Sequence, residues 1–130
     1  MNPKMRGERT EAKVLAKLLD CGFIVAVPFG SQRYDLIVDD GKKLIKVQVK
    51  TGCLRFGRVQ FRTCSAPGST QRARTYHGEV DAFVVYAPEL EKFYWVPIAK
   101  LPNRREVHLR IAPAKNGQTR YIKKAKDFEF

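Results

Sequence analysis

Two runs rich in β-branched residues, 34–38 and 44–50, flank the segment Asp39-Asp40-Gly41. Glycine adopts the positive φ of a tight hairpin turn without strain, so this pattern predicts two antiparallel strands joined by a short turn. Apolar and polar residues alternate along the second run, which places the two sets on opposite faces of a sheet. The hairpin is therefore expected to have one buried face and one polar face.

The polar face of this hairpin is expected to carry an acid, an amide and a lysine. Asp35 lies at the start of the first strand, and Gln48 and Lys50 lie two residues apart on the second strand. Antiparallel pairing brings the start of the first strand close to the end of the second. The arrangement suggests an active site. A hairpin with a solvated polar face is the alternative, because half-exposed strands are common.

A helix is predicted before the hairpin. Asn2 and Pro3 are the residue types of an N-cap and a first helical turn, and Gly22 is typical of a helix end. Apolar residues recur at helical spacing between them: Val14, Leu15, Leu18 and Leu19. At about 100° per residue, these residues form one apolar stripe along the helix.

Glu11 falls near the centre of that stripe, and Glu8 lies at its edge one turn earlier. A carboxylate aimed at the core is costly unless it meets a cation, a metal ion or hydrogen-bond donors. We therefore expect Glu11 to meet Asp35, Lys50 or a divalent ion. Glu8 is expected to lie behind the site or at the surface.

Several segments resemble a known family. They are Gly7-x3-Glu11, Phe29-Gly30-Ser31-x2-Tyr34-Asp35 and Val47-Gln48-Val49-Lys50-Thr51, followed by Tyr76, 80–86, 94–97 and 114–118. Together they resemble the group I intron-associated PD-(D/E)xK homing endonucleases over nearly the whole chain. The N-terminal segments also resemble archaeal Holliday-junction resolvases, which usually carry Glu at the position of Gln48.

The resemblance implies an α/β fold with a restriction-endonuclease-like core, in which few helices flank a mixed central sheet. It implies one domain over residues 1–130 and an endonuclease that hydrolyses phosphodiester bonds in double-stranded DNA. The catalytic residues would be Glu11, Asp35, Gln48 and Lys50. Mg²⁺, with Mn²⁺ as the alternative, would be held by Glu11, Asp35 and the main-chain carbonyl of Val49. Ser31 resembles a position near the scissile bond in the resolvases.

The charge of the chain favours a nucleic-acid partner. It has 25 Lys and Arg against 13 Asp and Glu, a formal charge of +12. The segment 55–77 contains five arginines and no acid, and the segment 100–126 contains nine Lys or Arg and one acid. Such clusters can replace counterions on DNA. The residues expected to contact DNA are Ser31, Arg33, Arg55, Arg58, Arg62, Arg72, Arg74 and His77.

The rest of the chain predicts further strands around one long loop. The expected strands are 24–27, 58–63, 81–87, 92–96, 107–111 and 121–123. The segment 64–78 lacks periodicity and is long for a loop in a compact domain, so we expect it to contact DNA. The aromatic segments 93–95 and 128–130 favour either a homo-oligomer contact, in a dimer or tetramer, or burial in the core.

Other partners and compartments are less consistent with the sequence. No membrane-spanning window, secretory signal or lipidation motif is found, and no nucleotide cofactor is expected. Cys21, Cys53 and Cys64 lack metal-binding spacing, and their odd number favours reduced thiols in the cytoplasm. Three hypotheses stay open: a site-specific endonuclease, a junction-directed or repair nuclease, and a non-catalytic DNA-binding module.

Overall fold

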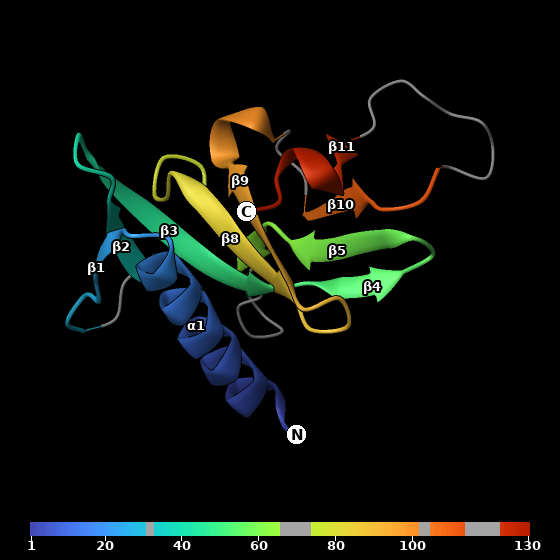
Figure 1. The fold of residues 1–130 in the computed structure, drawn as a ribbon, viewed down its shortest axis with the longest axis horizontal. Helices are drawn as coiled ribbons and strands as arrows, with labels where there is room; N and C mark the ends of the chain where they lie inside the picture. Colours follow the sequence, from blue (N-terminus) through green and yellow to red (C-terminus); the bar gives the residue numbers. More distant parts are fainter. Residues whose placement is uncertain (31–32, 66–73, 102–104, 114–122) are drawn as a thin grey trace.

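The computed structural model describes residues 1–30, 33–65, 74–101, 105–113 and 123–130 of the chain (Figure 1). The helices are α1 (Pro3–Asp20) and two short 3-10 helices, η1 (Ile98–Lys100) and η2 (Ala125–Asp127). The strands are β1 (Ile24–Ala26), β2 (Leu36–Asp39), β3 (Leu44–Thr51), β4 (Cys53–Arg55), β5 (Arg58–Arg62), β6 (Cys64–Ser65), β7 (Arg74–Thr75), β8 (Ala82–Ala87), β9 (Lys92–Pro97), β10 (Glu106–Arg110) and β11 (Lys123–Lys124).

The predicted N-terminal helix is confirmed as α1. The side-chain oxygen of Asn2 accepts a hydrogen bond from the backbone N–H of Met5 at 2.9 Å, which caps the first turn. Buried residues of the helix are Thr10, Val14 and Leu18. Leu19 is 53% exposed, so its predicted place in the apolar stripe is wrong. In the described part of the chain, no helix is long and apolar enough to span a membrane.

A five-stranded sheet has the order β1-β2-β3-β8-β9. β3 and β8 are parallel, and the other neighbouring pairs are antiparallel, so the predicted mixed central sheet with few helices is confirmed. The β2–β3 hairpin turns where the sequence predicts. Gly41 has φ +89°, and its backbone N–H donates a hydrogen bond of 2.9 Å to the Asp39 carboxylate.

Strand β8 is buried on both faces, as its continuous apolar sequence predicts. On one face, Val84 and Tyr86 join a core cluster with residues of α1, β2 and β3. On the other face, Phe83 and Val85 pack against Val59 and other residues of the second sheet. The sheet thus lies between α1 and a second layer of strands, and Figure 1 shows α1 running along β3 and β8.

The second sheet has four strands in the order β11-β10-β5-β4. Strand β4 follows β3 after the single residue Gly52, and it was not predicted from the sequence. The ends of the expected loop 64–78 are also ordered as strands, because β6 pairs with β7. Its central residues, 66–73, lie outside the described residues, as do Tyr121 and Ile122 of the last predicted strand.

The aromatic residues of the segments 93–95 and 128–130 pack within the chain. Tyr94 is fully buried, and the rings of Phe93 and Trp95 each lie 6.2 Å from that of Phe130, measured between centroids. Trp95 also stacks on Phe23 at 6.3 Å. Packing in the core therefore accounts for these aromatic segments without a second subunit.

Candidate active site

The β2–β3 hairpin places Asp35 opposite Gln48. Leu36 pairs with Val47, so the register puts Asp35, the residue before it, beside Gln48. The backbone N–H of Asp35 donates to the carbonyl oxygen of Val47 at 2.8 Å. The Asp35 carboxylate accepts a hydrogen bond of 2.8 Å from the backbone N–H of Val49. Main-chain contacts thus fix this carboxylate against β3.

Alternation along β3 separates its core residues from its polar residues. Val47 and Val49 are buried in the cluster that includes α1, so Gln48 and Lys50 lie on the opposite face. Both polar side chains are half-buried. Gln48 has no side-chain hydrogen-bond partner within the described ranges. Its amide is therefore available to a ligand.

Glu11 reaches the same place from α1. Burial raises the pKa of the Glu11 carboxyl, and the charge of Asp35, a hydrogen bond with Asp35 and the charge of Glu8 raise it further. Burial also raises the pKa of the Asp35 carboxyl. The hydrogen bond from Val49, the hydrogen bond with Glu11 and the positive charge of Lys50 lower it, but the effect of burial is larger. Two acidic groups therefore meet in a partly desolvated position. The structure brings Glu11, Asp35 and Lys50 together, and Glu8 lies at the surface.

A pair of hydroxyls joins the two elements behind these acids. The Oγ1 atoms of Thr10 and Thr51 lie 2.7 Å apart, and Thr10 is buried. Thr10 directly precedes Glu11 on α1, and Thr51 directly follows Lys50 on β3. This hydrogen bond fixes the helix against the end of β3, and the sequence analysis did not identify it.

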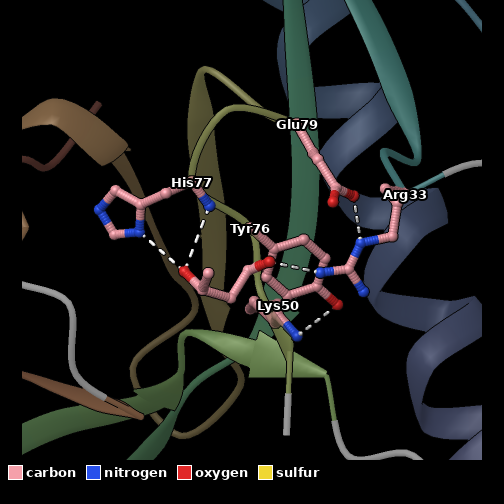
Figure 2. Close-up of polar contacts among 6 residues, drawn as sticks. Arg33, Lys50, Tyr76, His77 and Glu79 are labelled. Atoms are coloured by element: carbon pink, nitrogen blue, oxygen red, sulfur yellow. Dashed lines mark hydrogen bonds and ion pairs between the residues drawn. The ribbon is translucent and has the colours of Figure 1, made fainter.

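Lys50 lies over an aromatic ring that the sequence analysis did not assign to the site. Its Nζ is 4.8 Å from the ring centroid of Tyr76 and 3.5 Å from the Tyr76 hydroxyl oxygen (Figure 2). Burial lowers the pKa of the Lys50 ammonium, and the nearby charge of Asp35 opposes this shift. The ammonium is thus held between a carboxylate and a ring.

The donor set suits a hard divalent cation. Glu11 and Asp35 offer carboxylate oxygens, and Gln48, beside Asp35 in the strand register, offers a neutral amide oxygen. A cation would offset the burial that raises the pKa values of both acids, and the charge of Asp35 that raises the pKa of Glu11 further. Among the described residues, no group of three or more His, Cys, Asp or Glu could hold a metal ion.

The residues expected to contact DNA differ in their surroundings. Arg33 donates to Glu79 at 2.6 Å and to the carbonyl oxygen of Thr75 at 2.8 Å, so it is engaged within the chain. Arg55, Arg62 and His77 are exposed, and Arg58 is half-buried. Ser31, Arg72 and the side chain of Arg74 lie outside the described part of the structure.

Comparisons with known proteins agree with this fold. A family model described as PD-(D/E)XK endonuclease matches residues 1–130. A solved structure described as a bacterial homing endonuclease, I-Ssp6803I, is similar to this chain, with a TM-score of 0.78 and 25% sequence identity. The similarity covers 99% of this chain and 89% of that chain. No curated protein matches. Since the family match runs from end to end of a chain with this fold, the protein belongs to the PD-(D/E)XK endonuclease family and is a nuclease.

Proposed function

We propose that the chain is a Mg²⁺-dependent, site-specific endonuclease that hydrolyses both strands of double-stranded DNA. Membership of the family supports a DNA nuclease, and nucleases of this family generally use divalent metal ions. The observation that carries the proposal is the contact between Glu11 and Asp35 next to Lys50. The similarity to a structure described as a homing endonuclease favours site-specific cleavage over cleavage directed by DNA junctions.

Glu11, Asp35 and the main-chain carbonyl of Val49 would hold the ion. The N–H of Val49 points to Asp35, and in an extended strand the N–H and C=O of one residue point to the same side. The Val49 carbonyl is therefore well placed to join the two carboxylates. A bound divalent cation lowers the pKa of a coordinated water and neutralises charge during in-line displacement.

Lys50 would orient the attacking water and stabilise the negative charge that develops on the phosphate. Its nearness to Asp35 keeps the ammonium at the reacting centre. Gln48 would contribute its amide oxygen, or donate from its NH₂ group to a water or phosphate oxygen. With two carboxylates rather than three, the site carries about −2 before Lys50 is counted, which favours a single weakly held ion.

A row of basic residues crosses the second sheet and supports DNA binding. Cross-strand pairs place Arg55 opposite Arg58, Arg58 opposite Arg110, and Arg110 opposite Lys124. With strands about 4.8 Å apart, the row extends over about 14 Å. Like charges directly opposite one another destabilise a sheet, so a polyanion would stabilise this arrangement. We assign the row to phosphate contacts, together with the exposed Arg62 of β5.

Cleavage of both strands supports a homo-oligomer. One site cuts one strand at a time, and a twofold dimer presents two sites to two antiparallel strands. An exposed apolar group lies in or just after β1, the edge strand of the five-stranded sheet, and it suits a protein contact. Its residues are Ile24, Val27 and Phe29.

Light scattering at low micromolar concentration tests the proposed homo-oligomer. A monomer that makes double-strand breaks without assembling on DNA would contradict it.

The test of the proposed function is a cleavage assay on two substrates. A randomised linear duplex library and a four-way junction are incubated with Mg²⁺, and the cut ends are sequenced. We expect cleavage of the library at one recurring sequence and no preference for the junction. Selective cutting of the junction would instead identify a junction-directed nuclease, and no cleavage of either substrate would contradict the proposal.

A further inference from the structure

Tyr76 holds two cationic side chains over one ring. Lys50 Nζ lies 4.8 Å from the ring centroid, and the guanidinium carbon Cζ of Arg33 lies 4.0 Å from it. The tyrosine is 5% exposed, so both contacts occur largely away from solvent. Figure 2 shows Tyr76 next to Lys50 and Arg33, with the Glu79 carboxylate at the Nε atom of Arg33. The Tyr76 ring therefore lies directly beside the Lys50 ammonium.

Neighbouring groups fix the position of this ring. Arg33 donates from Nε to a carboxylate oxygen of Glu79 at 2.6 Å and from Nη2 to the carbonyl oxygen of Thr75 at 2.8 Å. Phe83 of β8 meets the Tyr76 ring edge to face, with centroids 5.6 Å apart and an interplanar angle of 89°. The ring is thus supported by the central sheet and by a hydrogen-bonded arginine.

A lysine in a nuclease site benefits from such a support. Its ammonium lies at the end of a flexible four-carbon chain, so its position must be restricted by the surrounding groups. The face of an aromatic ring attracts a cation through its quadrupole and leaves the charge intact. One N–H donor of Lys50 faces the Tyr76 hydroxyl oxygen at 3.5 Å, and its other donors remain available for a water and a phosphate oxygen.

We propose that Tyr76 is a positioning residue, whose ring face holds the Lys50 ammonium beside the Asp35 carboxylate. The consequence for cleavage rests on the proposed function, in which Lys50 acts at the scissile phosphate. The placement of Lys50 by the ring can be measured without any substrate. The two parts can therefore be tested separately.

The kinetic test compares Tyr76→Leu and Tyr76→Phe with a matched core variant, Phe61→Leu. Phe61 is 3% exposed and packs on Phe83 with centroids 5.7 Å apart, and it has no contact with Lys50 among the described contacts. The single-turnover rate constant is measured with enzyme in excess over duplex. Under that condition, loss of part of the folded enzyme does not change the rate constant.

We expect Tyr76→Leu to lower this rate constant by about tenfold to hundredfold, because a small displacement of a catalytic group costs that much. Tyr76→Phe keeps the ring face and should stay within about threefold of wild type, as should Phe61→Leu. The proposal is wrong if Tyr76→Leu cleaves as fast as Phe61→Leu. It is also wrong if Tyr76→Phe is as slow as Tyr76→Leu, since the hydroxyl would then carry the effect.

A spectroscopic test uses the free protein. Protons over the face of an aromatic ring resonate upfield, so the ε-methylene signal of Lys50 should be shifted upfield in wild type and in Tyr76→Phe. The signal is identified by its loss in Lys50→Gln, and it should return to the ordinary lysine position in Tyr76→Leu. An unshifted signal in wild type overturns the positioning role. If wild type shows the shift but cuts no DNA, the proposed function fails and the ring contact stands.

Discussion

At the scale of single residues, Gln48 distinguishes this site from one with three acids. It shares a strand face with Lys50 and lies opposite Asp35 in the β2–β3 register. A neutral amide adds an oxygen ligand without adding negative charge, and the number of charged ligands sets much of the affinity for a hard cation. The metal requirement of the enzyme should therefore respond strongly to this one side chain.

Gln48→Glu should lower the Mg²⁺ concentration for half-maximal cleavage by about tenfold, because it adds a carboxylate next to two others. Gln48→Ala should raise that concentration and slow cleavage. Titration of the cleavage rate with Mg²⁺ checks both variants, and thermal unfolding confirms that they fold. Wild-type rates and metal requirement in Gln48→Ala would show that the amide does not contact the ion.

The candidate site could be predicted from the sequence only for residues that lie close together in the chain or that stand out from the periodic pattern of a helix or strand. Asp35, Gln48 and Lys50 belong to one hairpin, and Glu11 stands out as an acid on an apolar stripe. The contact of Tyr76 with Lys50 joins residues 26 positions apart. Neither residue pattern nor spacing indicates that contact, because Tyr76 follows a two-residue strand in a segment without periodicity.

At the scale of secondary-structure elements, strong local signals gave correct predictions. Each of these signals depends on only a few neighbouring residues. They are the N-cap of α1, the turn at Gly41 and the continuous apolar run of β8. Strand β4 was missed because it has only three residues. The turn that follows it begins with Phe56 at φ 51°, a conformation for which glycine or asparagine is the usual residue. The pairing of β6 with β7 depends on residues far apart in the chain and gave no local signal.

Gly52 is the element-scale position most sensitive to substitution. A Cβ atom built there would lie 2.6 Å from Cγ1 of Val59 and 3.0 Å from Cγ1 of Val85, because β3 passes into β4 against the core. Gly52→Ala should lower the free energy of unfolding by about 1–3 kcal/mol through overpacking. Denaturant unfolding measures the change.

Gly7→Ala is the matched control for this substitution. Its Cβ meets nothing within 4 Å, and the residue lies inside α1. Alanine favours a helix interior by about 0.5–1 kcal/mol over glycine, so this variant should be more stable than wild type. Equal effects of the two substitutions would contradict the close packing at Gly52.

At the scale of the whole molecule, the central sheet lies between α1 and the second sheet, and β3 passes directly from one sheet to the other. Strand β3, which carries Gln48 and Lys50, thus continues into the sheet that carries the basic row of Arg55, Arg58, Arg110 and Lys124. Contacts with phosphates release counterions, so DNA affinity should fall steeply with salt. The folded arrangement predicts which basic residues contribute to that dependence.

Replacing Arg58 and Arg110 by Gln should reduce the slope of log affinity against log salt by about one unit each. Lys42 and Lys43 provide the control, because they are exposed in the turn between β2 and β3, which belongs to no strand of the basic row. Their replacement by Gln removes the same charge and should change the slope by much less. Fluorescence anisotropy at several salt concentrations measures the slopes. Equal reductions for both pairs would show that net charge, rather than the row, governs binding.

The most direct test of the proposed catalytic centre is the cleavage rate of Asp35→Asn in Mg²⁺, measured beside Asp20→Asn. Asp20 is exposed at the end of α1, so its variant controls for the loss of one acid. We predict no detectable cleavage by Asp35→Asn and wild-type cleavage by Asp20→Asn. DNA affinity should remain in both, because removing a carboxylate also removes repulsion from phosphate. Cleavage by Asp35→Asn at the wild-type rate would contradict the assignment of Asp35 and the centre built around it.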